Sequence, residues 1–144
     1  MRNLEEFYAR RLLRDIRFLR MSGHGCFSSH NQDGLLTYLA GVHMTYSGLR
    51  RRKWAGRAGR LIAAVYDLPS RERHPIRAII DATTSPDVDP KEKSRMARAL
   101  RFAWQTREEW GNASTTVGGF IRQTGGVSGC AAKFAQAKRE KRAQ

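Results

Sequence analysis

The chain has 144 residues, of which 27 are Lys or Arg and 13 are Asp or Glu, so its formal net charge is +14. Hydrophobic residues make up 40% of the chain, which suffices for one modest core or two very small ones. No apolar run is long enough to span a membrane, and we expect a cytoplasmic protein without a signal peptide.

The positive charge indicates the class of partner. A compact basic protein attracts polyanions, and nucleic acid is the commonest cellular polyanion. Counterion release makes such binding favourable at moderate salt. Anionic membranes and acidic protein surfaces are the alternative partners that this charge allows.

Residues 3–20 are predicted to form an amphipathic helix. Asn3 is a candidate cap. The apolar residues of the predicted core-packing face recur at three- and four-residue steps: Leu4, Phe7, Tyr8, Leu12, Ile16 and Leu19. The arginines between them are interpreted as the solvated back of this helix. Residues 21–34 are rich in Gly, Ser, Asn and Asp, which predicts a long loop.

Two apolar stretches follow, at 35–49 and 50–68, and predict either one long helix or two helices broken near Gly48. The second begins with the densest basic cluster of the chain, made of Arg50, Arg51, Arg52, Lys53, Arg57 and Arg60. On a helix, Lys53, Arg57 and Arg60 share one face, which suits phosphate contacts. Trp54 lies beside them, either exposed to stack on an unpaired base or buried in the core.

The segment Leu68-Pro69-Ser70 ends that helix, and Ser70 or His74 is expected to start the next one. Pro75 then occupies the first turn, with Ile76, Ile79 and Ile80 facing inward. Residues 83–88 form a turn-rich connection between an N-terminal part, 1–86, and a C-terminal part, 87–144. We expect the two parts to pack as one compact domain.

A clear helix start opens the C-terminal part. Asp89 is the predicted cap, Pro90 the first helical residue, and Glu92 the second half of a capping box. The helix is expected to run to about Trp110. Its predicted buried residues are Met96, Ala99, Leu100, Ala103 and Trp104.

Residues 114–136 predict two short helices joined by a glycine turn, the first capped by Ser114 or Thr115 and the second by Ser128. Gly126-Val127-Ser128 resembles the turn of bacterial helix-turn-helix proteins over about twenty residues, which implies DNA binding. Arg122 and Gly125 depart from that pattern, and a purely structural hairpin is the alternative. The candidate contacts of the second helix are Ser128, Lys133, Gln136, Lys138 and Arg139, mainly to phosphates.

Catalytic and metal sites are weakly supported. His24, Cys26 and His30 lie in the predicted loop and His43 lies downstream, but their spacing is not a zinc signature. A Cys26 nucleophile with a histidine base is chemically feasible, while the carboxylates are too scattered for acid–base chemistry. We therefore expect no catalytic residue, no metal and no cofactor.

Together these patterns predict an all-α bundle of about six helices that ends in a helix-turn-helix-like hairpin. The expected function is non-enzymatic binding of nucleic acid, DNA rather than RNA, by a regulator or a mobile-element accessory factor. The alternative is an interaction or inhibitor module that docks on an acidic protein or nucleoprotein surface. A protein partner or a second copy of the chain is compatible with either function.

Overall fold

A computed structural model describes residues 2–25, 32–68, 74–111 and 115–143. These residues form eight helices and no strand, so the all-α prediction is confirmed with more helices than the six expected. The chain divides into two compact units, Met1–Asp87 and Val88–Gln144, at the turn-rich stretch noted in the sequence. No helix of the described residues combines the length and the apolar character needed to cross a bilayer.

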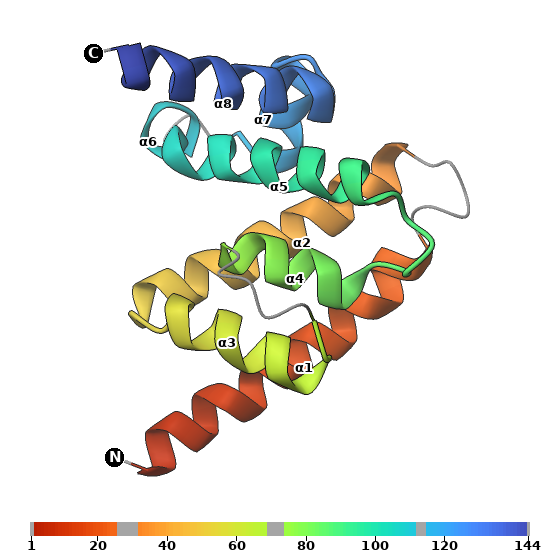
Figure 1. Cartoon of the computed structure of the whole chain (residues 1–144), viewed down its shortest axis with the longest axis vertical. Helices are drawn as coiled ribbons and strands as arrows, with labels where there is room; N and C mark the ends of the chain where they lie inside the picture. Colours follow the sequence, from red (N-terminus) through yellow and green to blue (C-terminus); the bar gives the residue numbers. More distant parts are fainter. Residues whose placement is uncertain (1, 26–31, 69–73, 112–114, 144) are drawn as a thin grey trace. The chain divides into compact units, whose positions relative to one another are not determined.

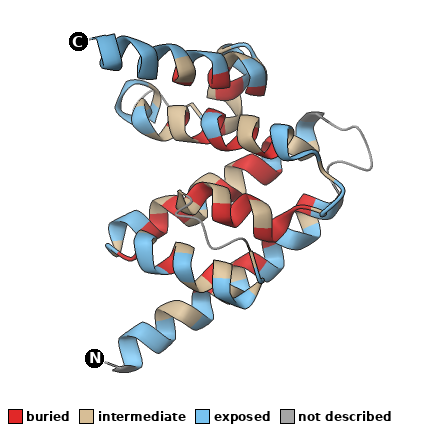
Figure 2. Ribbon diagram, in the orientation of Figure 1, coloured by how far each residue is buried: buried red, intermediate tan, exposed pale blue. Residues whose placement is uncertain are grey.

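The first unit consists of α1 (Arg2–Gly25), α2 (Gln32–Arg51), α3 (Ala55–Val65) and α4 (Pro75–Thr83) (Figure 1). Its core is built around α4, which contacts the other three helices and is largely buried (Figure 2). The sequence explains the start of α4: His74 Nδ1 accepts a hydrogen bond from the Ile76 N–H at 3.2 Å, and Pro75 opens the helix. The predicted helix start and the inward isoleucines are therefore confirmed.

The loop predicted at 21–34 is wrong at both ends. Helix α1 continues to Gly25 and α2 begins at Gln32, and the residues between them, 26–31, lie outside the described residues. The packing of α1 against α4 explains why residue 23 is a glycine. A Cβ there would lie 2.1 Å from the Thr83 carbonyl oxygen, so close packing of α1 on α4 requires glycine.

The second unit consists of α5 (Pro90–Gln105), α6 (Arg107–Trp110), α7 (Val117–Gln123) and α8 (Gly126–Ala143). The Asp89 carboxylate caps α5 by accepting from the Lys91 N–H at 2.9 Å, which confirms the predicted start. Glu92 is not part of a capping box, because its carboxylate pairs with Arg95 at 2.7 Å.

The predicted helix to Trp110 is interrupted at Thr106, so α5 ends at Gln105 and α6 is a separate single turn. This break lets the Trp110 indole fold back and donate to the Ala103 carbonyl at 3.0 Å. Its ring also stacks on Phe120 of α7, with centroids 5.2 Å apart. The predicted buried residues of α5 are buried except Trp104, which is partly exposed.

Candidate nucleic-acid interface

The basic cluster at 50–60 is a corner between two helices. Arg50 and Arg51 end α2, Arg52 and Lys53 form the turn, and Arg57 and Arg60 lie on α3. Lys53 has a positive φ of 56°, and the Trp54 N–H donates to the Leu49 carbonyl at 2.9 Å. The predicted helical face of Lys53, Arg57 and Arg60 is therefore wrong, because Lys53 has left the helix. The helix break also lies at this turn, and Gly48 is buried inside α2.

Trp54 is a core residue and not a stacking platform. Its side chain is 8% exposed, and its ring meets the Tyr8 ring edge-on with centroids 6.1 Å apart. The indole N–H is buried without a hydrogen-bond partner among the described residues. The structure thus settles the two options left open for this tryptophan in favour of burial.

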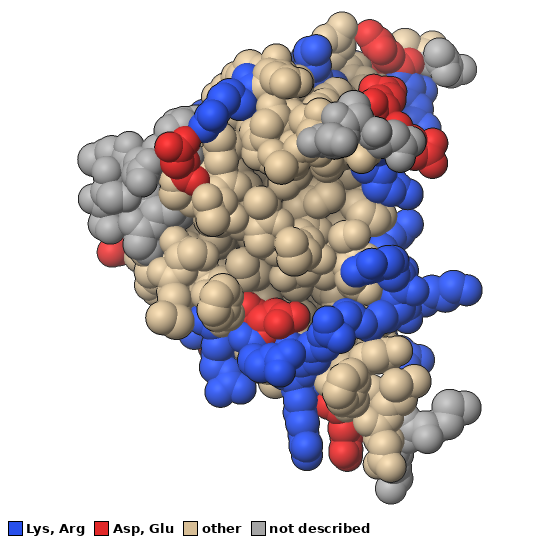
Figure 3. Space-filling view, turned by 180° about the vertical axis from the view of Figure 1, so that it is seen from behind, with Lys and Arg blue, Asp and Glu red and all other residues tan. Residues whose placement is uncertain are grey.

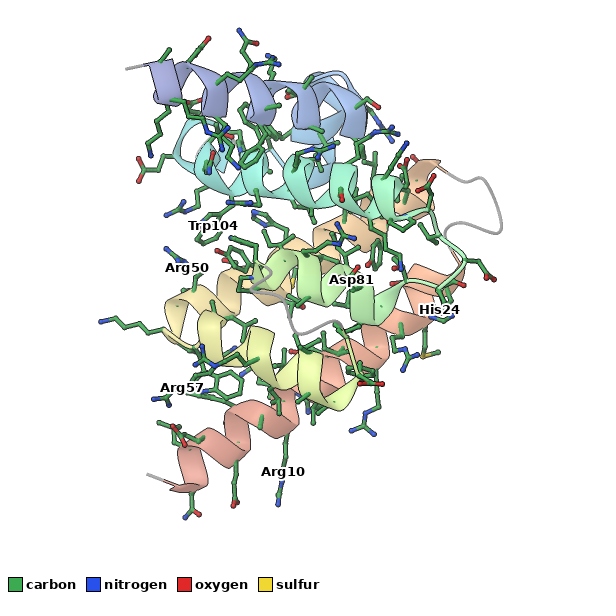
Figure 4. All side chains as sticks on the ribbon, viewed as in Figure 1. Arg10, His24, Arg50, Arg57, Asp81 and Trp104 are labelled. Atoms are coloured by element: carbon green, nitrogen blue, oxygen red, sulfur yellow. The ribbon has the colours of Figure 1, made fainter. Side chains whose placement is uncertain are left out.

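The first turns of α1 contact this corner. Glu5 forms an ion pair with Arg57, and both side chains are mostly exposed. The Arg52 guanidinium lies over the Tyr8 ring, 5.6 Å from its centroid. Figure 4 shows Arg57 reaching from α3 toward α1. The N-terminal part of α1 and the corner are therefore one continuous surface.

The backbone adds positive potential at the same place. Helix α3 begins directly after Trp54, and no side chain among the described residues caps its N-terminus. The first N–H groups of a helix lack intrahelical acceptors, and the helix dipole gives this end a partial positive charge. That charge adds to the charges of Lys53 and Arg57.

The outer face of α1 carries further cations, which the sequence pattern predicted to be the solvated back of this helix. The exposed arginines are Arg10, Arg11, Arg14, Arg17 and Arg20. Arg10 extends outward from α1 (Figure 4). Seen from behind, the basic side chains of the first unit form a band over α1 and the end of α2, broken by acidic side chains (Figure 3). The spacing of these arginines, three and four residues apart in the sequence, is what indicates that they share one face of the helix.

The predicted helix-turn-helix is not confirmed. Thr116, rather than Ser114 or Thr115, caps α7 by accepting from the Gly119 N–H at 3.0 Å, and Ser114 lies outside the described residues. Gly125 and Gly126 both adopt positive φ, and α8 begins at Gly126. Ser128 is thus inside the first turn of α8 and does not cap it. A helical hairpin is present, but its predicted cap is wrong.

Helix α8 presents few cations together. It buries Val127, Cys130, Ala131 and Phe134 and packs along α5. Of the predicted contacts, Lys133 and Arg139 each lie about 60° from Gln136 on the helical wheel and share its exposed face, whereas Lys138 points about 160° away from Gln136. Gln136 donates to the Glu140 carboxylate at 3.2 Å. The structure therefore separates the C-terminal candidates.

The histidines and cysteines do not form a site in the described part of the chain. His24 is exposed in the last turn of α1, His43 lies within α2, and Cys26 and His30 fall outside the described residues. Within the described ranges, no three metal-ligating side chains come together. Burial raises the pKa of the Cys130 thiol, so this cysteine is a protonated core residue at neutral pH.

Comparisons with protein-family models, curated proteins and solved structures found no match. The candidate interface is therefore defined by its own charge and geometry. Its cations come from α1, the α2–α3 corner and the first turns of α3, all within the first unit. We call this surface the basic band: it consists of Arg10, Arg11, Arg14, Arg17, Arg20, Arg50, Arg51, Arg52, Lys53, Arg57 and Arg60.

Proposed function

We propose that the protein binds nucleic acid, duplex DNA in the first instance, through the basic band. The observation that carries this proposal is the corner itself, where Arg51, Lys53 and Arg60 are exposed around the uncapped start of α3. Arginine and lysine at such a place neutralise phosphates and release condensed counterions. The protein would act by binding rather than by catalysis.

The band is suited to the phosphate backbone and carries few groups that read bases. Arg57 contributes less than its neighbours, because Glu5 partly neutralises it. Arg52 is held over Tyr8, which fixes its guanidinium at the edge of the corner. Phosphate contacts position a protein on a duplex without specifying sequence. We therefore expect binding with little base preference.

Helix α8 is a second and weaker surface under this proposal. Lys133 and Arg139 share one exposed face, but Glu140 lies beside them. A carboxylate in this position repels phosphate. Replacing Lys133 and Arg139 with Ala is therefore expected to reduce affinity for DNA less than an equal loss of charge from the corner.

Fluorescence anisotropy with a labelled DNA duplex at low salt tests the proposal. The variant Arg51→Ala/Arg60→Ala removes two exposed corner cations and is expected to raise the Kd by roughly tenfold, about 0.7 kcal/mol per removed charge. The matched control, Lys91→Ala/Arg98→Ala, removes the same charge from the exposed face of α5. Equal losses for the two variants would contradict a localised interface.

The alternative function, docking on an acidic protein or nucleoprotein surface, makes a different prediction in the same assay. A module of that kind needs its protein partner and does not hold naked duplex. Failure of the wild-type protein to bind duplex, single-stranded DNA or RNA at low salt would remove the proposal and leave this alternative.

A further inference from the structure

One face of α1 combines cations with large apolar side chains that remain in solvent. Phe7, Phe18 and Met21 are 56%, 74% and 78% exposed. Together with the arginines they follow steps of three and four residues along the outer face. We call this surface the α1 stripe: it consists of Phe7, Arg10, Arg11, Arg14, Arg17, Phe18 and Met21.

The side chains of the α1 stripe are exposed in the described part of the first unit. The opposite face of the helix buries Leu12, Ile16 and Leu19 in the core. Phe18 and Met21 are exposed neighbours three residues apart on α1, and contiguous exposed apolar side chains rimmed by polar residues mark interaction sites. The stripe spans about 21 Å, since Phe7 and Met21 are separated by four helical turns.

The charge of the α1 stripe determines which class of ligand it can bind. Arg10, Arg11 and Arg14 form no ion pair with a carboxylate among the described residues. Glu6 and Asp15 flank the stripe, four residues from Arg10 and Arg11 respectively, and lie at its edges rather than on it. The occupant must therefore be anionic, and it must also offer apolar or aromatic surface to Phe18 and Met21.

An unpaired nucleic-acid strand meets both requirements, because each nucleotide carries one phosphate in the backbone and one flat base. Aromatic side chains stack on such bases without regard to sequence, while arginines hold the backbone. A membrane-binding helix has a different pattern, with apolar and basic residues on opposite faces. In α1 the two kinds are interleaved on one face, which favours a strand over a lipid surface.

We infer that the α1 stripe binds single-stranded nucleic acid, with Phe18 stacking on a base and Arg14 and Arg17 contacting the adjoining phosphates. The inference rests on the proposed function and adds to it a binding site for unpaired strands. The α1 stripe adjoins the corner. The Phe7 and Tyr8 rings have centroids 6.2 Å apart, and the Arg52 guanidinium of the corner lies over the Tyr8 ring. A bound strand would run from the corner along α1.

Anisotropy with a labelled oligothymidine and with a duplex of equal length tests this inference. Phe18→Ala removes the stacking ring from an exposed position, so the fold is retained, and it is expected to weaken oligothymidine binding roughly fivefold or more. The duplex Kd should change less than twofold, because its bases are already stacked. Met44→Ala on α2, where the side chain is 72% exposed, is the matched control and should change neither.

The outcomes separate the two claims. If the wild-type protein binds neither the duplex nor oligothymidine, the proposed function as a whole is refuted. Normal binding of duplex and oligothymidine with no effect of Phe18→Ala would refute only the α1 stripe. Weaker binding of Phe18→Ala to vesicles containing phosphatidylserine, with oligothymidine binding unchanged, would assign the stripe to a membrane and overturn the inference.

Discussion

The phenolic oxygen of Tyr38 lies 2.5 Å from the hydroxyl oxygen of Thr83, and both side chains are fully buried. Thr83 donates its own proton to the Ile79 carbonyl at 2.7 Å. Tyr38 must therefore be the donor to Thr83. This hydrogen bond joins α2 to the end of α4, which is the helix around which the first unit is built.

Replacing Tyr38 with Phe removes that donor and keeps the ring. We expect the free energy of unfolding to fall by about 1 kcal/mol, the net value of one buried hydrogen bond. Urea unfolding followed by tryptophan fluorescence measures it. Tyr66→Phe, at a partly exposed position, serves as the control and should change stability by less than about 0.5 kcal/mol. Equal effects would mean that the Tyr38 hydroxyl contributes nothing specific.

Gly23→Ala is expected to lower the stability of the protein, which is the opposite of what helix propensity predicts. Alanine is favoured over glycine in a helix by about 1 kcal/mol. A Cβ at Gly23, however, would lie 2.1 Å from the Thr83 carbonyl oxygen and 2.9 Å from Tyr38 Cε1. Gly23→Ala is therefore expected to destabilise the first unit by about 2 kcal/mol.

The control for Gly23 is Gly59 in the interior of α3. The three atoms nearest to a Cβ there would all belong to Pro75, at 3.7–3.9 Å, which is ordinary contact. Gly59→Ala should be neutral or stabilising by up to about 1 kcal/mol. Thermal unfolding of the two variants compares them, and a stabilised Gly23→Ala protein would show that α1 does not pack closely on α4.

The buried thiol of Cys130 makes stability depend on alkaline pH. Burial raises its pKa above the ordinary 9.0, against the smaller lowering effects of Thr124 and Lys133. The unfolded thiol ionises first, so its stabilising contribution is complete below about pH 9 and is lost as the pH rises toward the raised folded pKa. Cys130→Ala abolishes this contribution.

Urea unfolding of the wild type and of Cys130→Ala between about pH 8 and about pH 10 isolates the thiol, because all other titrating groups are shared. The stability advantage of the wild-type protein should shrink as the pH increases. A difference that stays constant over this range would mean that the thiol is not protected from ionisation by the fold.

Glu5 is predicted to restrain binding. Glu5→Gln removes the carboxylate that neutralises Arg57 and raises the charge of the corner. We expect duplex affinity to increase roughly twofold, since exposed ion pairs are worth about 0.5 kcal/mol, with little change in stability. Glu108→Gln, at an exposed position of α6, makes the same charge change in the second unit and should have less effect. Unchanged affinity of Glu5→Gln would place the DNA away from the corner.

Local chemistry allowed the sequence to predict several helix starts. Asp89 before Pro90 and His74 before Pro75 determine their helix starts through neighbouring backbone groups alone, and the structure confirms both. The spacing of Ile76, Ile79 and Ile80 likewise indicates one buried face, because a short helix repeats every three to four residues. These features need no knowledge of the rest of the fold.

Tertiary contacts explain the failures. The helix continues through Gly23 because α4 lies against it, and no local pattern in 21–34 reveals that neighbour. Trp54 is buried and packs against Tyr8 of α1, 46 residues earlier in the chain, so its position beside arginines in the sequence did not indicate its environment. The spacing in α1 predicted that Leu4 and Phe7 share the core-packing face of Leu19, which is wrong because both are exposed. Only the structure shows that Phe18 also lies in solvent while Leu19 is buried.

The salt dependence of duplex binding tests the central claim most directly. The slope of log affinity against log salt should fall by about 1.8 in Arg51→Ala/Arg60→Ala, because each lost phosphate contact removes about 0.9. The control Lys91→Ala/Arg98→Ala should keep the slope of the wild-type protein. A slope that is the same in all three proteins, or wild-type protein that does not bind DNA at low salt, would contradict the account.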